Sequence, residues 1–353
     1  MSEEGELNAS AGALMSAEIE AQPEVLDHVL REGRDAARAA ARAVAQARPR
    51  FVLLAGRGTS DHAALYAKYL VEIMLGLPAG LTSPSTYSVY GSQPDLHDAV
   101  VLAVSQSGES PDLVETVRVA RSQGAMTVVV TNSVNSSLAQ ESEVVLDVLA
   151  GAESAVAATK SYTAELLTLW LLIDAWAGGD GSDASGVPAT ADHLVSLRPA
   201  VAQWATRYRF TERMVLTGRG YAFPTVLEGA LKLMETTYAS AHAFSGADLM
   251  HGPLAMLGPD TPVIALLPAG AGAHSMAPVI ERLVQRNVDL AVIGPHSTRG
   301  SVSLGLVTPE ETPEYLAPIT DVIALQWLSL EMALGRGIDP DCPRALHKIT
   351  ETR

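Results

Sequence analysis

The chain has 353 residues, of which 48% are hydrophobic and 18% are charged. This composition excludes a mostly disordered chain and is sufficient for two domains with separate cores. The 24 basic and 40 acidic residues give a formal net charge of −16, which disfavours nucleic acid or an anionic membrane surface as a partner. The single cysteine, Cys342, can form neither an internal disulfide nor a multi-cysteine zinc site, and this usage is typical of a cytoplasmic protein.

The N-terminal residues are acidic and polar, and they lack the basic and apolar segments of a signal peptide. We interpret residues 1–14 as a disordered tail. The most apolar stretch, residues 166–177, is interrupted by Asp174 and is too short to span a bilayer. We therefore expect no membrane partner.

Apolar runs of the first half recur in the second half at a nearly constant offset. Residues 51–58 (FVLLAGRG) resemble 214–220 (MVLTGRG), residues 100–104 resemble 262–266, and residues 127–130 resemble 289–292. One such match would be chance, but three in the same order indicate two copies of one unit.

Within each copy, short runs rich in Val, Leu and Ile alternate with helical stretches. This alternation predicts an α/β fold in which a parallel sheet is covered by helices on both faces, as a three-layer αβα sandwich. The polar Gly/Ser/Asp-rich stretch between the copies predicts a linker. We expect a first domain at 15–177, a linker at 178–190, a second domain at 191–340 and a C-terminal tail at 341–353.

Ligands of open parallel sheets bind at the carboxyl ends of the strands, so the loops there are the places to search. The run at 99–104 is followed by SQSGES at 105–110, and a helix is expected to begin at about Leu113. Hydroxyl groups at a helix N-terminus form a neutral cup that suits a phosphate monoester. The alternative is an ordinary turn with Ser110 as N-cap and Pro111 at the first helical position.

Three hydroxyls within six residues favour the phosphate interpretation. The equivalent loop of the second copy, residues 267–272 (LPAGAG), has no hydroxyl, so we expect phosphate only in the first copy. Residues 56–60 (GRGTS) follow the first strand, where Thr59 and Ser60 could add donors; the alternative is a tight structural turn.

The second copy carries charged residues at helical spacing. Glu228, Lys232 and Glu235 are four and three residues apart and share one face of a helix. Taken alone, this pattern is more often a surface ladder of salt bridges. His251 precedes Gly-Pro on a predicted turn, which favours an exposed or site histidine. The nine histidines have no metal-ligand spacing, so we expect no metal site.

Taken together, these segments resemble the sugar isomerase (SIS) domain family, and within it the isomerase half of glucosamine-6-phosphate synthases. The resemblance runs from Met15 to the end of the chain. The matching motifs, in order, are MSAEIEAQP at 15–23, GTS at 58–60, SQSGES at 105–110, ATK at 158–160, EGALK at 228–232 with Glu235, HGPL at 251–254 and PRALHK at 343–348.

The resemblance implies a phosphate and substrate site made of hydroxyl and loop residues. The residues concerned are Thr59, Ser60, Ser105, Gln106, Ser107 and Ser110 for phosphate, with Val156 and Ala158 on the substrate-side loop. It implies two tandem SIS domains, no cofactor and a small-molecule sugar phosphate as the ligand.

The resemblance also implies catalytic roles. Glu235 matches the base that moves a proton between C1 and C2, and Lys348 matches the lysine that forms a Schiff base with the keto sugar. Lys232 and Glu228 match the polar groups around the sugar hydroxyls. His251 matches the ring-opening residue that comes from the neighbouring subunit, which implies a homodimer with shared active sites.

The glutaminase part of the synthases has no counterpart in this sequence. Our leading hypothesis is therefore an amino-sugar-phosphate deaminase/isomerase that converts glucosamine 6-phosphate, or a close relative, to fructose 6-phosphate and ammonia. The alternatives are a glutaminase-lacking fructose-6-phosphate aminotransferase that uses ammonia and runs in the opposite, synthetic direction, a deglycase acting on fructosamine 6-phosphate, and a non-catalytic sugar-phosphate sensor. The presence of both Glu235 and Lys348 argues against a sensor, which would need neither.

Overall fold

The computed structural model describes residues 11–300, 302, 304–346 and 348. The chain forms two compact units, which are described separately. The N-terminal unit contains residues 23–152 and 160–188. The C-terminal unit contains residues 11–22, 153–159 and 189–348.

The N-terminal unit is built on a parallel five-stranded sheet with the strand order β2-β1-β3-β4-β5. Every residue of the central strand β3 is buried, as its continuous apolar run predicts. The strands are β1 (Phe51–Ala55), β2 (Ala79–Leu81), β3 (Ala99–Ser105), β4 (Met126–Thr131) and β5 (Val144–Asp147).

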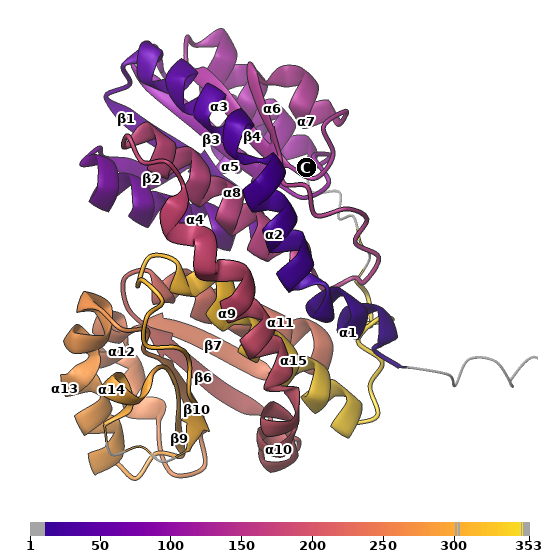
Figure 1. The fold of residues 1–353 in the computed structure, drawn as a ribbon, viewed down its shortest axis with the longest axis vertical. Helices are drawn as coiled ribbons and strands as arrows, with labels where there is room; N and C mark the ends of the chain where they lie inside the picture. The colour runs from indigo at the N-terminus through magenta and orange to yellow at the C-terminus, as the bar shows by residue number, and fades with distance from the viewer. Residues whose placement is uncertain (1–10, 301, 303, 347, 349–353) are drawn as a thin grey trace, which may run out of the picture. The chain divides into compact units, whose positions relative to one another are not determined.

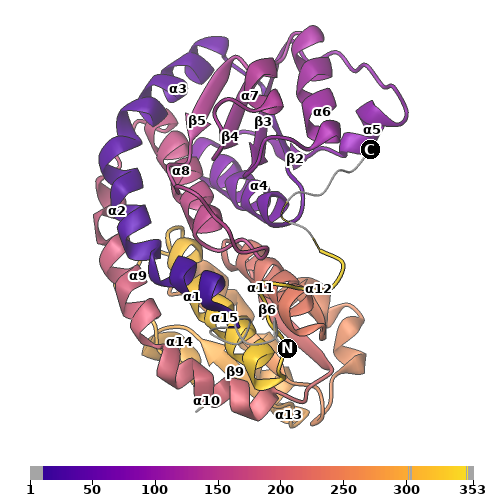
Figure 2. The same cartoon turned by 90° about the vertical axis from the view of Figure 1, so that its right-hand side faces the viewer.

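Helices cover both faces of this sheet (Figures 1 and 2). Helices α3, α4 and α8 pack together on one face, and α5, α6 and α7 pack on the other. The helices are α2 (Gln22–Glu32), α3 (Arg34–Ala47), α4 (Thr59–Leu70), the π-helical turn η1 (Val71–Leu75), α5 (Pro84–Ser88), α6 (Pro111–Ser122), α7 (Ser137–Glu141), α8 (Lys160–Trp176) and the 3₁₀ helix η2 (Ser182–Gly186).

The C-terminal unit repeats this plan with the strand order β10-β9-β8-β6-β7, and all its strands are again parallel. The recurring apolar runs fall on β6, β8 and β9, which match β1, β3 and β4 in position. The predicted duplication is therefore confirmed. The strands are β6 (Arg213–Gly218), β7 (Ser240–Ser245), β8 (Val263–Leu266), β9 (Leu290–Ile293) and β10 (Gly305–Leu306).

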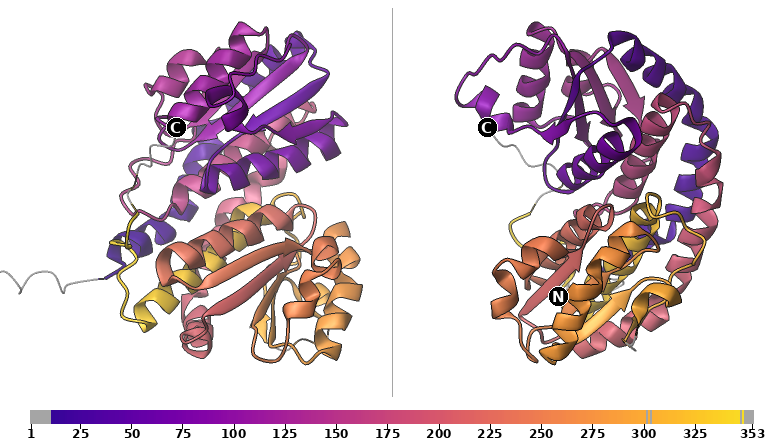
Figure 3. Two further views of the ribbon diagram at one scale, coloured as in Figure 1. Left: turned by 180° about the vertical axis from the view of Figure 1, so that it is seen from behind. Right: turned by 90° about the vertical axis from the view of Figure 1, so that its left-hand side faces the viewer.

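In the C-terminal unit, α11 and α15 lie against each other on one side of the sheet, with α10 and α1 against α15, and α12 and α13 lie on the other side (Figure 3). The helices are α1 (Ala13–Glu20), α9 (Val187–Ser196), α10 (Arg198–Tyr208), α11 (Ala222–Thr237), α12 (Gly246–Met250), η3 (Pro253–Met256), α13 (Ala271–Gln285), α14 (His296–Arg299) and α15 (Ala317–Gly335).

The unit boundaries differ from those expected. Helix α1 begins at Ala13, so the last two residues of the expected tail are helical, and residues 1–10 lie outside the described residues. Residues 15–22 and 153–159 belong to the C-terminal unit rather than to the first repeat. The expected linker folds as η2 and the start of α9, and the division between the units falls after Pro188.

The most apolar helices of each unit are buried on nearly every side. α8 and α15 have this character, because α3 and α4 cover α8 while α1, α10 and α11 cover α15. In the described part of the chain, no helix combines the length and the hydropathy needed to cross a membrane.

Candidate functional site

The loop between β3 and α6 has the predicted strand-to-helix geometry. Strand β3 ends at Ser105 and α6 begins at Pro111, which places Ser110 at the N-cap position. This is the position that the capping alternative requires. However, the Ser110 side chain accepts no capping hydrogen bond from the described residues of the helix. Its hydroxyl therefore remains available for a ligand.

A glycine makes the turn of this loop possible. Gly108 has a φ of +65°, and a Cβ atom built on it would lie 2.0 Å from Ser136 Oγ. The Gly108 N–H donates to Ser105 Oγ at 3.1 Å, and the Gly108 carbonyl accepts from the Leu138 N–H at 3.0 Å. The loop is thus locked against the start of α7 in a shape that only glycine permits without strain.

Three hydroxyl donors of this loop remain unused. Ser105 Oγ and Ser107 Oγ each accept a backbone N–H, from Gly108 at 3.1 Å and from Glu109 at 3.3 Å. A hydroxyl that accepts still has its own proton to donate. Within the described chain, neither these two hydroxyls nor that of Ser110 donates to a protein acceptor, and the Gln106 amide makes no side-chain hydrogen bond. Such a group of donors at a helix N-terminus suits an anion.

The neighbouring turn between β1 and α4 was expected to add the hydroxyls of Thr59 and Ser60 to the phosphate site. Thr59 and Ser60 open α4, but the Ser60 hydroxyl donates to Oε1 of the buried Glu165 at 3.0 Å. In this arrangement Ser60 links α4 to α8. The same turn carries Arg57, which forms an ion pair with the buried Asp112 of α6. The sequence analysis did not single out Arg57.

The charged residues of α11 form a buried group rather than a surface ladder. Glu228 and Lys232 are fully buried, so the surface alternative is wrong. Lys232 Nζ lies 2.6 Å from Glu235 Oε2 and 3.3 Å from Glu228 Oε1. Burial alone lowers the pKa of Lys232, but the two carboxylates outweigh it and raise that pKa above its ordinary value. Lys232 is therefore a permanent cation that orients its neighbours.

Glu235 is the member of this group that reaches the surface. Its side chain is 23% exposed, whereas those of Glu228 and Lys232 are covered. Oε2 is held by Lys232, and Oε1 accepts no hydrogen bond from the described residues. A carboxylate with one anchored and one accessible oxygen can accept a proton at a fixed position.

Lys348 folds back onto a buried carboxylate. Its Nζ donates to Glu153 Oε2 at 3.0 Å and to the Ala155 carbonyl at 2.6 Å. The Glu153 carboxylate is buried, and its other oxygen accepts the Thr159 N–H at 2.9 Å. The lysine thus meets the segment that contains Val156 and Ala158. Glu153 was missed in the sequence analysis, because no local pattern connects residues 195 positions apart.

Two residues of the 15–23 motif hold this segment in place. Glu18 of α1 accepts the N–H groups of Ser154 and Ala155, the latter at 3.3 Å. Gln22 donates to Gln326 of α15 at 2.8 Å, and Gln326 donates to the Thr159 carbonyl at 3.3 Å. Burial raises the pKa of Glu18, and the neighbouring Glu153 carboxylate adds to the rise, against the lowering effect of the Ser154 N–H.

His251 is separate from these groups. It lies on the exposed turn after α12, where its N–H donates to the Asp248 carbonyl at 3.0 Å. Its imidazole forms neither a hydrogen bond nor an ion pair with any residue that the structure describes. The resemblance places His251 in the site of a neighbouring subunit, and this role stays a prediction.

Comparison with known proteins agrees with this architecture. The family model described as "SIS domain" matches residues 47–175 and 209–336, which are the two repeats. The chain belongs to the SIS domain family.

The curated relatives of this chain include a longer enzyme. The glutamine–fructose-6-phosphate aminotransferase [isomerizing] of Bordetella pertussis is 34% identical over 312 residues, which cover 84% of this chain and 51% of that protein. The chain thus spans about half the length of the curated relatives it matches.

Two solved structures show the same arrangement. The C-terminal domain of glucosamine-fructose-6-phosphate aminotransferase from Francisella tularensis matches with a TM-score of 0.85 and 25% identity, covering 94% of this chain and 99% of that one. The glucosamine-6-phosphate deaminase of Thermotoga maritima matches with a TM-score of 0.73, covering 96% of this chain and 100% of that one. At 22% identity the second match supports the fold alone.

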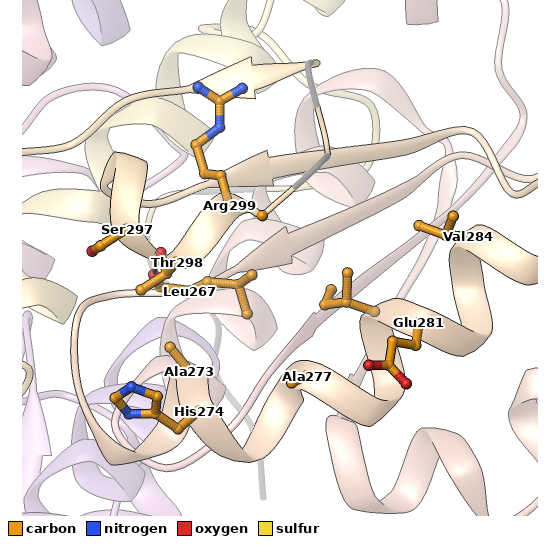
Figure 4. A pocket seen from close by; sticks show the side chains of 11 residues that line it. Leu267, Ala273, His274, Ala277, Glu281, Val284, Ser297, Thr298 and Arg299 are labelled. Carbon is orange, nitrogen blue, oxygen red and sulfur yellow. Dashed lines mark hydrogen bonds between the residues drawn. The ribbon is translucent and has the colours of Figure 1, made fainter.

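The second SIS repeat has a different pocket where the first has its serine loop. A cavity of about 350 Å³ lies beside Leu267, between α13 and α14 (Figure 4). Its hydroxyl groups are already used: Thr298 donates to the Leu267 carbonyl and Ser297 to Glu310, both at 2.6 Å. Among the described residues, this pocket has no equivalent of the unused serine donors. That phosphate binds only the first repeat stays a prediction.

Proposed function

We propose that this protein is an amino-sugar-phosphate deaminase/isomerase that converts glucosamine 6-phosphate, or a close relative, to fructose 6-phosphate and ammonia. The serine loop of 105–110 binds the phosphate. His251 of a neighbouring subunit opens the sugar ring, and Glu235 moves a proton between C2 and C1. Lys348 takes the carbonyl carbon as a Schiff base.

In the first step, Glu235 removes the C2 proton of the open-chain aldehyde and returns a proton to C1. One proton passes from the nitrogen to O1, so that C1 becomes a primary alcohol and C2 an imine. Lys348 gives one proton to the Glu153 carboxylate that it contacts. The resulting amine adds to the imine carbon and ammonia leaves, so the sugar is held as a ketimine of the enzyme. Water then hydrolyses the ketimine, releases fructose 6-phosphate and restores the amine. The sum is amino sugar phosphate plus water giving keto sugar phosphate plus ammonia.

The observation that carries this proposal is the pair of contacts that holds the Lys348 ammonium. A lysine near the end of the chain is ordinarily solvated, yet this ammonium is bound by a buried carboxylate and a backbone carbonyl. The buried cation of Lys232, which anchors one oxygen of Glu235, gives independent support because it fixes a carboxylate at a defined position.

The direct test is a substrate panel. The protein is incubated with 6-phosphorylated amino sugars and fructosamines, and the ammonia and keto-sugar phosphate that are released are measured for each. We expect turnover of glucosamine 6-phosphate or a close epimer, and none of unphosphorylated glucosamine. Binding without turnover of any member would contradict the enzyme and favour a sensor.

Two variants then test the residue roles. Glu235→Gln keeps the shape of the side chain and removes the base, so we expect the rate to fall by ~10²–10⁴ with substrate binding retained. Glu115→Gln is the matched control, because Glu115 is also paired with a basic residue on a helix, namely Arg118. Borohydride with fructose 6-phosphate should label wild type and not Lys348→Ala. Near-wild-type turnover by Glu235→Gln is incompatible with the mechanism.

A further inference from the structure

The turn between β1 and α4 carries a cation that is tied to the serine loop. Arg57 Nε donates to Asp112 Oδ2 at 2.7 Å, and an Nη group donates to the same oxygen. Asp112 occupies the first turn of α6, two residues after Ser110. The ion pair therefore joins the two loops at the carboxyl ends of the adjacent strands β1 and β3.

The two partners of this pair differ in their exposure to solvent. The Asp112 side chain is 3% exposed, whereas that of Arg57 is 45% exposed. Both hydrogen bonds go to one oxygen of Asp112, and Oδ1 has no partner among the described residues. A guanidinium has five N–H donors, and those of Arg57 not directed at Asp112 make no hydrogen bond within the described chain. Arg57 thus presents N–H donors at the surface that no described residue uses.

Arg57 is surrounded by acidic residues in the two loops. Residues 56–61 and 105–112 contain three acidic residues, Asp61, Glu109 and Asp112, and Arg57 is their one basic residue. A carboxylate in the first turn stabilises a helix, but it repels a phosphate dianion at the same N-terminus. The serine hydroxyls can bind the phosphate by hydrogen bonds, but they are neutral and leave the negative charge of Asp112 in place.

We propose that Arg57 is a phosphate-binding residue of this site: it neutralises Asp112 and directs its remaining N–H groups at the phosphate. This inference rests on the proposed function, in which the serine loop binds a sugar phosphate. It makes the site selective for a doubly charged phosphate monoester, because the neutral donors alone discriminate weakly by charge.

The test uses three variants of the intact protein and fructose 6-phosphate as the probe, with binding measured by calorimetry. Arg57→Met removes the cation, Asp112→Asn removes the carboxylate, and the double variant removes both, so that no buried charge is left unpaired. We expect Asp112→Asn to bind at least as tightly as wild type. We expect Arg57→Met and the double variant to bind ~10–100-fold more weakly, since charge-assisted hydrogen bonds are lost in both.

The control and the kinetics separate binding from folding. Arg50→Met makes the same chemical change at the amino end of β1, where the Arg50 side chain is 80% exposed, and should leave the affinity unchanged. For a panel substrate, the loss in the double variant should appear in KM with kcat within about threefold of wild type, because phosphate contacts contribute uniform binding. If Arg57 had only a structural role, its loss would not raise KM while leaving kcat nearly unchanged.

Three outcomes overturn the inference. If the double variant regains wild-type affinity, Arg57 only neutralises Asp112 and does not touch phosphate. If Ser107→Ala weakens binding while the Arg57 variants do not, the serine loop is retained and this inference alone fails. The absence of fructose 6-phosphate binding by wild type would instead remove the proposed function and this inference with it.

Discussion

A carboxylate of α15 is buried without a partner among the described residues. Asp321 of α15 is 2% exposed, and its Oδ2 makes no hydrogen bond with any described residue. Burial raises the pKa of Asp321 to about 7, because a charged carboxylate is poorly solvated in an apolar environment. The folded protein therefore retains a proton there that the unfolded chain releases near the ordinary value of 3.8.

This difference makes the stability of the protein depend on pH. The free energy of unfolding should fall as the pH rises from about 4 to about 7, because the folded state binds more protons in that window. Asp321→Asn has no proton to lose. We expect the Asp321→Asn variant to be more stable than wild type at pH 8. At pH 5 the difference between their free energies of unfolding should be smaller by on the order of 2 kcal/mol.

Urea unfolding midpoints of both proteins at the two pH values test this prediction. Other acids whose pKa is raised by burial, such as Glu18 and Asp174, are common to both proteins. The difference between the two curves therefore isolates Asp321. An equal gap at pH 5 and pH 8 would contradict the prediction.

At the scale of single residues, the sequence predicted side chains but not their surroundings. The spacing of Glu228, Lys232 and Glu235 is the same for a surface ladder and for a buried group, so only the packing of α11 against α15 decides between them. Glu153 and Arg57 were missed for a related reason. Their partners are 195 and 55 residues away, and such contacts arise from tertiary structure.

At the scale of elements, the β3–α6 turn depends on one glycine. A Cβ atom on Gly108 meets Ser136, and its φ of +65° disfavours other residues. Gly108→Ala should therefore displace the serine loop, and we expect KM for a phosphorylated substrate to rise at least ~10-fold, as expected when a charged hydrogen bond is lost.

Gly91→Ala is the matched control for this prediction. Gly91 has a nearly equal φ of +63° in an exposed loop, but a Cβ atom there meets nothing within 4 Å. Gly91→Ala therefore places alanine at a positive φ without a steric clash, and steady-state kinetics should show an unchanged KM. A similar KM for both variants would mean that the shape of the loop does not depend on Gly108.

The order of elements was predictable, but the boundaries of the units were not. The offset of the apolar runs is enough to predict two similar sheets, because strands that are buried on both faces must be continuously apolar. Composition failed between the repeats, where a Gly- and Ser-rich stretch folds as η2 and the start of α9. It failed also at residues 15–22, whose place is set by bonds to Gln326 and to the 153–159 segment.

At the scale of the whole molecule, the role proposed for His251 predicts a homodimer. If His251 serves a neighbouring site, then Glu235→Ala and His251→Ala are each inactive alone. We expect a mixture of the two to regain activity, because a mixed dimer contains one site with both groups. Recovery is measured after subunit exchange has been verified with two affinity tags. No recovery after verified exchange would assign His251 to the site of its own subunit.

The path of the chain prevents the two units from being separated by a single cut. The backbone passes between the two units after residues 22, 152, 159 and 188. Asp339 and Asp341 accept N–H groups at the start of α1, so the beginning and the end of the described chain are joined inside one unit. A single cut in the Gly-rich segment after α8 would therefore yield two fragments, neither of which contains a complete C-terminal unit. The two repeats are separable in the sequence, whereas a recombination event that exchanged one of them would have to carry α1 and the 153–159 segment with the second.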